Sequence, residues 1–494
     1  MEILDKLRKR TLELTDMHHV MALMQWDQEI MMPKSAASER ASQMATLSAV
    51  IHRKEVSEEL GDLLKAAEDG LDKYSETEQA LVRVMRRSYD QNTKMPEEFV
   101  AEFSRLTSEA LHFWIDARQQ SDFAGFEPVL AKVVAMSKQQ AEYLGYTNEP
   151  YDALLDIYEE GLTALQVREM FAGLKEPLVE MIREARKNPD SELFFDRDFD
   201  QGRQVQFAEK ALAEIGYDFS RGRQDVSTHP FSTTLGHNDR RVTNRYSPRS
   251  IEFIFSALHE GGHGIYEQGI DENLMHTALD TGVSLGIHES QSRLWENIIG
   301  RGLPFWEHFY PELQKDFPEH FRGVSVKDFV RGINHVKPGF IRVEADEVSY
   351  NLHVLVRFEL ERALIEGSIK VADLPGAWNQ KYKEYLGVEV DSHANGVLQD
   401  IHWAHGSFGY FPTYTIGNLA AAQIWHTYTE LEADYAKDIA GGNLHKVKEW
   451  LSHNIYRHGS VYPPEALLVR VTGEKLNSRY FVDYLKNKMA WLKA

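Results

Sequence analysis

The sequence predicts a mainly α-helical fold that contains one small β-sheet. Across most of the first 190 residues, apolar residues recur at three- and four-residue spacing, with Glu, Lys and Arg on the opposite faces. This pattern is typical of bundle helices with a solvated outer face. A later segment departs from it, because residues 226–246 place Ser, Thr and β-branched residues around a Gly-His-Asn-Asp turn. We therefore predict a large helical body with a β-hairpin.

The N-terminal helices follow from the periodicity in chain order. Met32-Pro33 interrupts the pattern, since proline lacks an amide donor and disfavours a helical residue before it. Pro189 and Asp190 are expected to end this helical block. The predicted helices cover residues 1–30, 36–66, 76–90, 96–121, 127–145 and 163–187.

Length and composition restrict the class of protein. A chain of 494 residues can form two to four domains, or one helical body with two lobes. Cysteine is absent, so disulfides and thiol chemistry are excluded, which suits a reducing cytoplasm. Residues 1–10 lack the apolar core of a signal peptide, and no stretch of about 18 apolar residues predicts a membrane span. The net charge of −21 repels phosphate backbones, so nucleic acid is not an expected partner.

The predicted hairpin has two open interpretations. It comes shortly before the segment that carries the strongest motif of the chain. An exposed strand edge there could pair with an extended peptide through backbone hydrogen bonds. The hairpin could equally be a small sheet without a ligand.

The strongest motif is His259-Glu260-Gly261-Gly262-His263, which fits the pattern His-Glu-x-x-His. Residues four apart share one face of a helix, so His259 and His263 can hold one metal ion. Glu260 is offset by about a hundred degrees and can act on a water molecule beside the metal. The alternative is a solvated helix turn that happens to contain two His.

Two glycines inside the motif favour a functional helix. Gly261 and Gly262 each cost up to about 1 kcal/mol relative to alanine in a helix. A helix accepts this cost where a substrate or a second backbone must approach closely. We therefore expect a close approach at these two positions.

A catalytic zinc ion takes three protein ligands and keeps one open position. Residues 286–297 are predicted to form a second helix, and Glu289 lies 26 residues after His263 (289 − 263). His288 is the rival third ligand, and His276 is a weaker one. The metzincin alternative requires Gly-x-x-His soon after His263, and the chain lacks it.

Two later segments supply candidate substrate contacts. Residues 340–361 are predicted to form one long helix, in which Arg342 could pair with Asp346 or hold a substrate carboxylate. Residues 396–418 mix His and Tyr with Gly and Pro. Such His and Tyr donors could stabilise an oxyanion, or they could line an aromatic interior loop. The polar residues of this segment are Gln399, Asp400, His402, His405, Tyr410 and Tyr414.

Taken together, these segments resemble the thermostable zinc carboxypeptidases typified by carboxypeptidase Taq. The resemblance spans the whole chain, with one departure at Asn244, where a second threonine is expected after Thr243. Its six ordered motifs are His229-Pro230-Phe231, Asp239-x-Arg241-x-Thr243, His259-Glu260-x-x-His263, His288-Glu289-Ser290-x-Ser292-Arg293, Ile341-Arg342-x-x-Ala345-Asp346 and Gly396-x-x-Gln399-Asp400-x-His402-Trp403.

The resemblance implies a fold, an activity and partners. The fold is a large helical body in two lobes around a deep groove, with a small β-sheet, and is distantly similar to neurolysin and angiotensin-converting enzyme. Residues 1–494 then form a single catalytic unit, with residues 1–200 as a helical lobe or lid and residues 201–494 as the zinc-binding lobe. The implied protein is a cytoplasmic homodimer with one metal per subunit. It removes single C-terminal residues from peptides with broad preference.

The expected roles follow residue by residue. His259, His263 and Glu289 hold Zn²⁺, for which Co²⁺ or Mn²⁺ could substitute, and Glu260 is the general base. The candidate oxyanion donors are His405, Tyr410 and Tyr414. The candidate substrate-binding residues are Arg342 first and Arg241 second for the terminal carboxylate, with His229, Gln399, Asp400 and His402.

Two alternatives remain. The same zinc ligands would serve an oligopeptidase or a dipeptidyl carboxypeptidase, which cuts further from the C-terminus. A helical interaction scaffold with a structural zinc ion is disfavoured, because such sites are usually closed by four Cys or His ligands.

Overall fold

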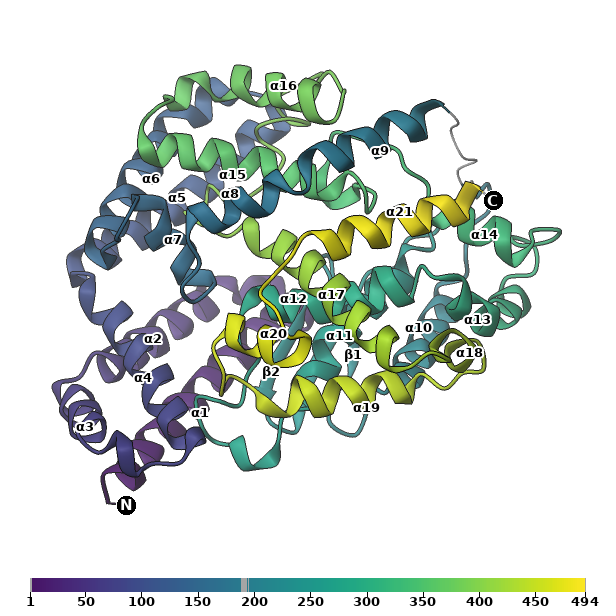
Figure 1. Cartoon of the computed structure of the whole chain (residues 1–494). Coiled ribbons are helices and arrows are strands. Elements are labelled where there is room, and N and C mark those ends of the chain that lie inside the picture. Colours follow the sequence, from purple (N-terminus) through teal and green to yellow (C-terminus); the bar gives the residue numbers. More distant parts are fainter. Residues whose placement is uncertain (1, 188–192, 194, 494) are drawn as a thin grey trace. The chain divides into compact units, whose positions relative to one another are not determined.

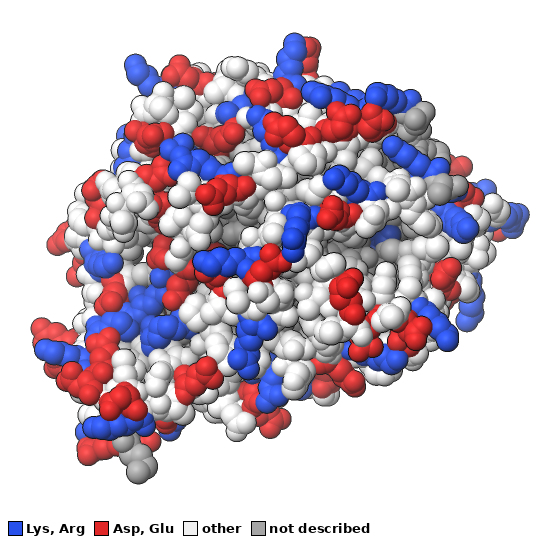
Figure 2. Space-filling view, viewed as in Figure 1, with Lys and Arg blue, Asp and Glu red and all other residues white. Residues whose placement is uncertain are grey.

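The computed structural model describes residues 2–187, 193 and 195–493 and is mainly α-helical with one small sheet (Figure 1). The predicted fold class is thus confirmed. Pro189 and Asp190 lie outside the described residues. Within the described ranges, none of the helices combines the length and apolarity that a bilayer crossing requires. Acidic and basic side chains are interspersed on the face shown in Figure 2, so the negative charge forms no single patch there.

The predicted N-terminal helices are confirmed, although two of them divide, and the helix at Pro150–Tyr158 was not predicted. Ser57 caps a new helix, because its hydroxyl accepts from the amide of Leu60, and so splits the segment 36–66. The capping box of Thr163 and Gln166 starts the later pair. The helices are α1 (Glu2–Ile30), α2 (Ala37–Glu55), α3 (Glu58–Glu68), α4 (Glu76–Lys94), α5 (Glu97–Gln120), α6 (Phe123–Leu144), α7 (Pro150–Tyr158), α8 (Ala164–Ala172) and α9 (Lys175–Lys187).

The remainder of the chain is also largely helical. A π-helix, η4 (Leu294–Ile299), continues α12 without a break. The α-helices are α10 (Gln201–Ile215), α11 (Glu252–Gln268), α12 (Leu285–Arg293), α13 (Leu303–Asp316), α14 (Val326–Ile333), α15 (Tyr350–Glu366), α16 (Leu374–Tyr385), α17 (Pro412–Leu431), α18 (Tyr435–Ala440), α19 (His445–Asn454), α20 (Pro464–Thr472) and α21 (Arg479–Lys493). The short 3₁₀ turns are η1 (Lys34–Ala36), η2 (Leu71–Lys73), η3 (Glu272–Leu274), η5 (Arg342–Glu344), η6 (Val371–Asp373) and η7 (Tyr456–His458).

The sheet contains the predicted hairpin and one further strand. Strands β2 (Ser232–Gly236) and β3 (Asp239–Asn244) pair antiparallel, as predicted. Strand β1 (Gln224–Val226) adds in parallel to the other side of β3, which no sequence pattern indicated. Helix α11 packs against β2 and β3, so the sheet supports the motif helix.

The long helix predicted over residues 340–361 was wrong at its start. Arg342 lies in the 3₁₀ turn η5, and the helix begins only at Tyr350. The Asp346 carboxylate accepts hydrogen bonds from the amides of Val348 and Ser349, each at 3.0 Å. Such side-chain bonds compete with helical hydrogen bonds.

The chain forms two compact units, each built from three segments. The first contains Met1–Thr93, Leu193–Val330 and Ala420–Lys475. The second contains Lys94–Glu192, Arg331–Leu419 and Leu476–Ala494. Both units thus draw on the chain before and after residue 200. The lobe boundary and the groove implied by the resemblance stay predictions.

The core of the first unit fixes the chain that follows the motif helix. Ile270, Leu274 and Leu279 come after α11 and are buried together with apolar residues of α1, α3 and α4. Burying each such side chain contributes about 1.5–3 kcal/mol. This packing anchors the connection between α11 and α12.

The close approach expected at the motif glycines is confirmed. A Cβ atom on Gly262 would lie 2.6 Å from the carbonyl oxygen of Gln291 and 2.7 Å from Cα of Ser292, both backbone atoms of α12. A Cβ atom on Gly261 would instead contact side-chain carbons of Leu212 and Ile215. Gly262 therefore permits two helix backbones to touch.

We predict that Gly262→Ala lowers the free energy of unfolding. Overpacking costs about 1–3 kcal/mol, and the gain in helix propensity offsets at most about 1 kcal/mol. Urea unfolding measures the change. Gly261→Ala is the control and should cost less, because side chains can move aside. Equal losses, or a fully stable Gly262→Ala, would contradict this interpretation.

Candidate metal centre

Three predicted ligands converge between α11 and α12. The ligand atoms of His259, His263 and Glu289 all lie within 4.8 Å of one another. Oε2 of Glu289 lies 3.7 Å from Nε2 of His259 and 3.6 Å from Nε2 of His263. Helix α11 supplies both imidazoles from one face, and the close approach at Gly262 brings in the carboxylate. Two nitrogen donors and one oxygen donor suit Zn²⁺.

The rival ligand His288 lies behind the cluster instead. Its Nδ1 is 2.5 Å from Nδ1 of His263, and its Nε2 is 3.0 Å from Oε1 of Glu267. His288 thus contacts the rear nitrogen of a ligand, not the atoms that converge. His276, the weaker candidate, does not belong to the three-residue group.

The hydrogen bonds that connect His263, His288 and Glu267 have a direction that depends on the charge of Glu267. Burial alone would raise the pKa of Glu267, but the hydrogen bond from His288 and the charge of Arg240 lower it to about 2. Glu267 is therefore an ionised acceptor, so Nε2 of His288 donates to it. In the tautomer of His288 that carries its proton on Nε2, Nδ1 of His288 accepts from Nδ1 of His263, and Nε2 of His263 then has its lone pair toward Glu289.

The second imidazole is held by a carboxylate directly. Nδ1 of His259 lies 2.8 Å from Oε2 of Glu296, on the π-helix η4. Arg293 joins the two acids, since its Nε donates to Glu289 at 2.7 Å and its Nη1 to Glu296 at 3.2 Å. Burial alone would raise the pKa of Glu296, but Arg293 and His259 lower it to about 2. Each imidazole thus has its rear nitrogen in a hydrogen bond.

Sequence reasoning missed Glu267 and Glu296 as supporting groups. For Glu296 a signal existed, because Glu289, Arg293 and Glu296 recur at i, i+4 and i+7 on one helical face. For Glu267 no local signal existed, since its partners Arg240 and Gly282 come from a strand and a loop.

Glu260 is buried beside the ligands. Burial raises its pKa to about 7, with the nearby Glu289 acting in the same direction and His259 opposing. A bound cation would favour the ionised form. A carboxylate that titrates close to neutral pH is suited to receive a proton and return it.

The two candidates near the hairpin have different surroundings. Arg241 on β3 donates two hydrogen bonds of 2.8 Å to Asp239 and stacks over the ring of Trp26. His229 is exposed in the segment between β1 and β2. Asn244, the departure from the expected threonine, donates to the carbonyl of Phe253 at 2.9 Å and so ties β3 to α11.

The second unit gathers most of the other candidates around the partly buried carboxylate of Asp400. Asp400 accepts from Arg342 at 2.8 Å and from Arg357 at 2.7 Å. Burial alone would raise the pKa of Asp400, but these two arginines lower it far below its usual range. Gln399 accepts from Arg357 and from the amide of Arg342. The partner of Arg342 is therefore Asp400, not the alternative Asp346.

The aromatic candidates adjoin this group. Tyr414 lies under the guanidinium of Arg342, 4.7 Å from ring centroid to Cζ, and its hydroxyl is 3.3 Å from Nε2 of His402. The ring of Tyr410 lies 5.3 Å from that of His402. Burial lowers the pKa of His402 to about 3, so the imidazole is neutral. His405, in contrast, is exposed.

Glu361 is a further buried acid that sequence reasoning missed. It accepts hydrogen bonds from Tyr151 at 2.6 Å, from Trp403 at 2.7 Å and from the amide of Gly409 at 2.9 Å. It thereby fastens the loop that precedes Tyr410 to α15. Its position among apolar helix residues gave no sign of this role.

Comparisons with known proteins identify the family of the chain. The sequence model described as "Carboxypeptidase Taq (M32) metallopeptidase" matches residues 6–489. The chain is 41% identical over 471 residues to "Carboxypeptidase 1" of Bacillus subtilis (strain 168), covering 94% of each protein. It is 42% identical to "Thermostable carboxypeptidase 1" of Pyrococcus furiosus, covering 95% of each.

A solved structure extends the agreement to three dimensions. The crystal structure of the M32 carboxypeptidase from Deinococcus radiodurans R1 superposes with a TM-score of 0.97 at 38% identity, covering 100% of this chain and 99% of the other. Sequence and fold match over nearly the full length. The chain therefore belongs to the carboxypeptidase Taq (M32) family of metallopeptidases.

Proposed function

We propose that this metallocarboxypeptidase uses Zn²⁺ held by His259, His263 and Glu289 to release single C-terminal residues from peptides with broad preference. The observation that carries the proposal is the convergence of two Nε2 atoms and one carboxylate oxygen beside the buried Glu260. Family membership supports a divalent metal and peptide substrates. One zinc ion per subunit, Co²⁺ or Mn²⁺ as substitutes, the homodimer and the cytoplasmic location stay predictions.

The electrostatics of the surroundings also fit a divalent cation. Burial lowers the pKa of His263, so a neutral ligand is available. Five carboxylates close to the ligands are accompanied by three arginines, of which Arg301 also pairs with the exposed Glu252, so acidic groups outnumber basic ones here. These groups are Glu260, Glu267, Asp280, Glu289, Glu296, Arg240, Arg293 and Arg301.

The proposed reaction assigns one role to each group. A divalent cation held here supplies a Lewis acid for the scissile carbonyl and for water. Glu260 takes the proton of the attacking water and delivers it to the leaving amine nitrogen. Glu296 and His288 keep the two imidazoles in the orientation that ligation requires. His405, Tyr410 and Tyr414 stay candidate oxyanion donors, and His229, Gln399, Asp400 and His402 stay candidate substrate contacts.

The alternatives differ in their support. The same metal ligands would serve an oligopeptidase or dipeptidyl carboxypeptidase, but the curated relatives are carboxypeptidases. The helical scaffold with a structural zinc ion is disfavoured, because a buried acid adjoins the ligands and the chain belongs to a metallopeptidase family.

Glu260→Gln should keep its metal and lose about 10²–10⁴-fold in rate, because the amide cannot accept the proton of water. Mass spectrometry of products from a five-residue peptide measures the rate, and the sequential loss of single residues separates our proposal from release of dipeptides. Glu252→Gln, at the exposed start of α11, is the matched control and should behave as wild type. Full activity of Glu260→Gln would refute its role as base.

Glu296→Gln and His288→Ala should each weaken Zn²⁺ binding by about 10–100-fold, because an imidazole without its rear partner is less well oriented. Competition with a chromophoric chelator measures the affinity. Glu307→Gln, which changes an exposed acid on α13, is the control. Wild-type affinity in both variants would show that these two groups do not support the ligands.

Arg342→Ala should reduce kcat/KM for free peptides far more than for C-terminally amidated peptides, if its two uncommitted N–H groups hold the terminal carboxylate. Arg342 is buried and paired, so urea unfolding must accompany the kinetics. Arg241→Ala is the parallel variant. Equal losses on both substrates would move the carboxylate contact away from Arg342.

A further inference from the structure

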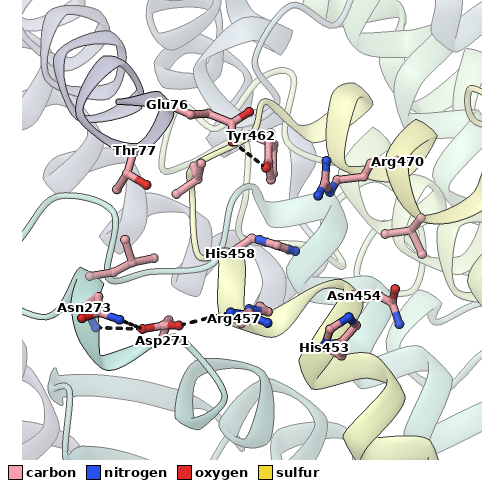
Figure 3. A pocket seen from close by; sticks show the side chains of 13 residues that line it. Glu76, Thr77, Asp271, Asn273, His453, Asn454, Arg457, His458, Tyr462 and Arg470 are labelled. Carbon is pink, nitrogen blue, oxygen red and sulfur yellow. Dashed lines mark hydrogen bonds and ion pairs between the residues drawn. The ribbon is translucent and has the colours of Figure 1, made fainter. Parts of the chain in front are cut away.

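A pocket lies in the first unit, apart from the metal cluster. It has a volume of about 790 Å³ and lies among the start of α4, the turn η3, the end of α19, the turn η7 and α20 (Figure 3). This volume falls within the range of roughly 300–1,000 Å³ that small-molecule sites have. None of its lining residues belongs to the three metal ligands or adjoins them in sequence.

One part of the lining is cationic. Arg470 lies over the ring of Tyr462, 4.9 Å from its centroid, and forms no ion pair within the described part of the chain. Arg457 lies 3.7 Å from Asp271, beyond hydrogen-bond distance. The ring of His458 lies against that of Tyr462, with centroids 5.2 Å apart. Two guanidinium groups therefore keep donors for a ligand carboxylate.

Another part is anionic. Glu76, the first residue of α4, accepts a hydrogen bond from the hydroxyl of Tyr462 at 3.0 Å. Asp271 accepts from the amide and the side chain of Asn273 at 2.9 and 2.7 Å through the same oxygen, Oδ1. A carboxylate has about four acceptor positions, so both acids retain capacity for an ammonium group.

The charges of the pocket lining indicate which class of ligand the pocket can bind. Arg457 and Arg470 offset Glu76 and Asp271, and burial with the two arginines lowers the pKa of His458, which favours its neutral form. Phosphate would bring negative charge that this lining does not compensate, whereas a ligand with one ammonium and one carboxylate group finds a partner for each. Leu274, Val461 and Val471 supply apolar surface for a side chain.

We propose that this pocket binds short zwitterionic peptides, with free amino acids as the smallest members of the class. The carboxylate is held by Arg470 and Arg457, and the ammonium group by Glu76 and Asp271. These ligands are the products and short substrates of a carboxypeptidase. The binding itself requires no metal and no catalysis, so it can be tested separately from the proposed function.

The test is calorimetric titration of zinc-loaded Glu260→Gln protein with triglycine. We expect a binding event that Arg470→Gln weakens at least tenfold, while any second event at the metal cluster keeps its Kd. Arg322→Gln, an exposed arginine paired with Glu319 outside the pocket, is the matched control and should change nothing. If Arg470→Gln leaves every event unchanged, the proposal is wrong. If Glu260→Gln still hydrolyses triglycine, the titration is repeated at 4 °C with glycylglycine in place of triglycine. The same comparison between the variants then decides.

Ligand chemistry provides the second comparison. N-acetyl-triglycine lacks the ammonium group and triglycine amide lacks the carboxylate, and each should bind the pocket at least tenfold more weakly than triglycine. Glu76→Gln should weaken triglycine but not N-acetyl-triglycine. Inorganic phosphate should not displace triglycine. If phosphate or N-acetyl-triglycine competes as well as triglycine does, the pocket is a simple anion site and the zwitterion proposal fails.

Discussion

The contact between the backbones of α11 and α12 at Gly262 is the constraint on which the proposed metal cluster depends. Any side chain at this position would meet backbone atoms of Gln291 and Ser292, which cannot move independently of α12. The distance between the helices in turn sets how near Glu289 comes to His259 and His263. A residue that contributes no ligand atom therefore determines whether three ligand atoms converge.

The supporting hydrogen bonds determine which nitrogen of each imidazole faces Glu289. Each imidazole presents Nε2 to Glu289 because its Nδ1 is committed elsewhere, directly to Glu296 for His259 and through His288 to Glu267 for His263. Charges buried this deeply require partners, and the arginines provide them. Arg240 also connects Glu267 to Asp280, so β3 is fastened to the rear of the metal helix. The sheet is thus part of the support of the site.

In the second unit, hydrogen-bonded ion pairs likewise fix the side chains around Asp400. Asp400 joins Arg342 and Arg357, and Gln399 accepts from both residues. These bonds hold η5, α15 and the loop before α17 together. A guanidinium fixed in this way has a defined orientation, which is a requirement for recognising a planar carboxylate. Its burial also means that stability and recognition are coupled at Arg342.

The sequence alone determined the helical class, the hairpin and the metal motif, because each is encoded in residues that are neighbours along the chain. Periodicity predicts a helix, and a His pair four residues apart predicts a shared face. The six ordered motifs also identified the family. The tertiary structure decided what depends on distant partners: the parallel strand β1, the start of α15 at Tyr350, the pairing of Arg342 with Asp400 and the supporting roles of Glu267 and Glu361. Buried charged groups pair with whatever packing brings near them, and packing joins segments whose separation in sequence carries no local signal.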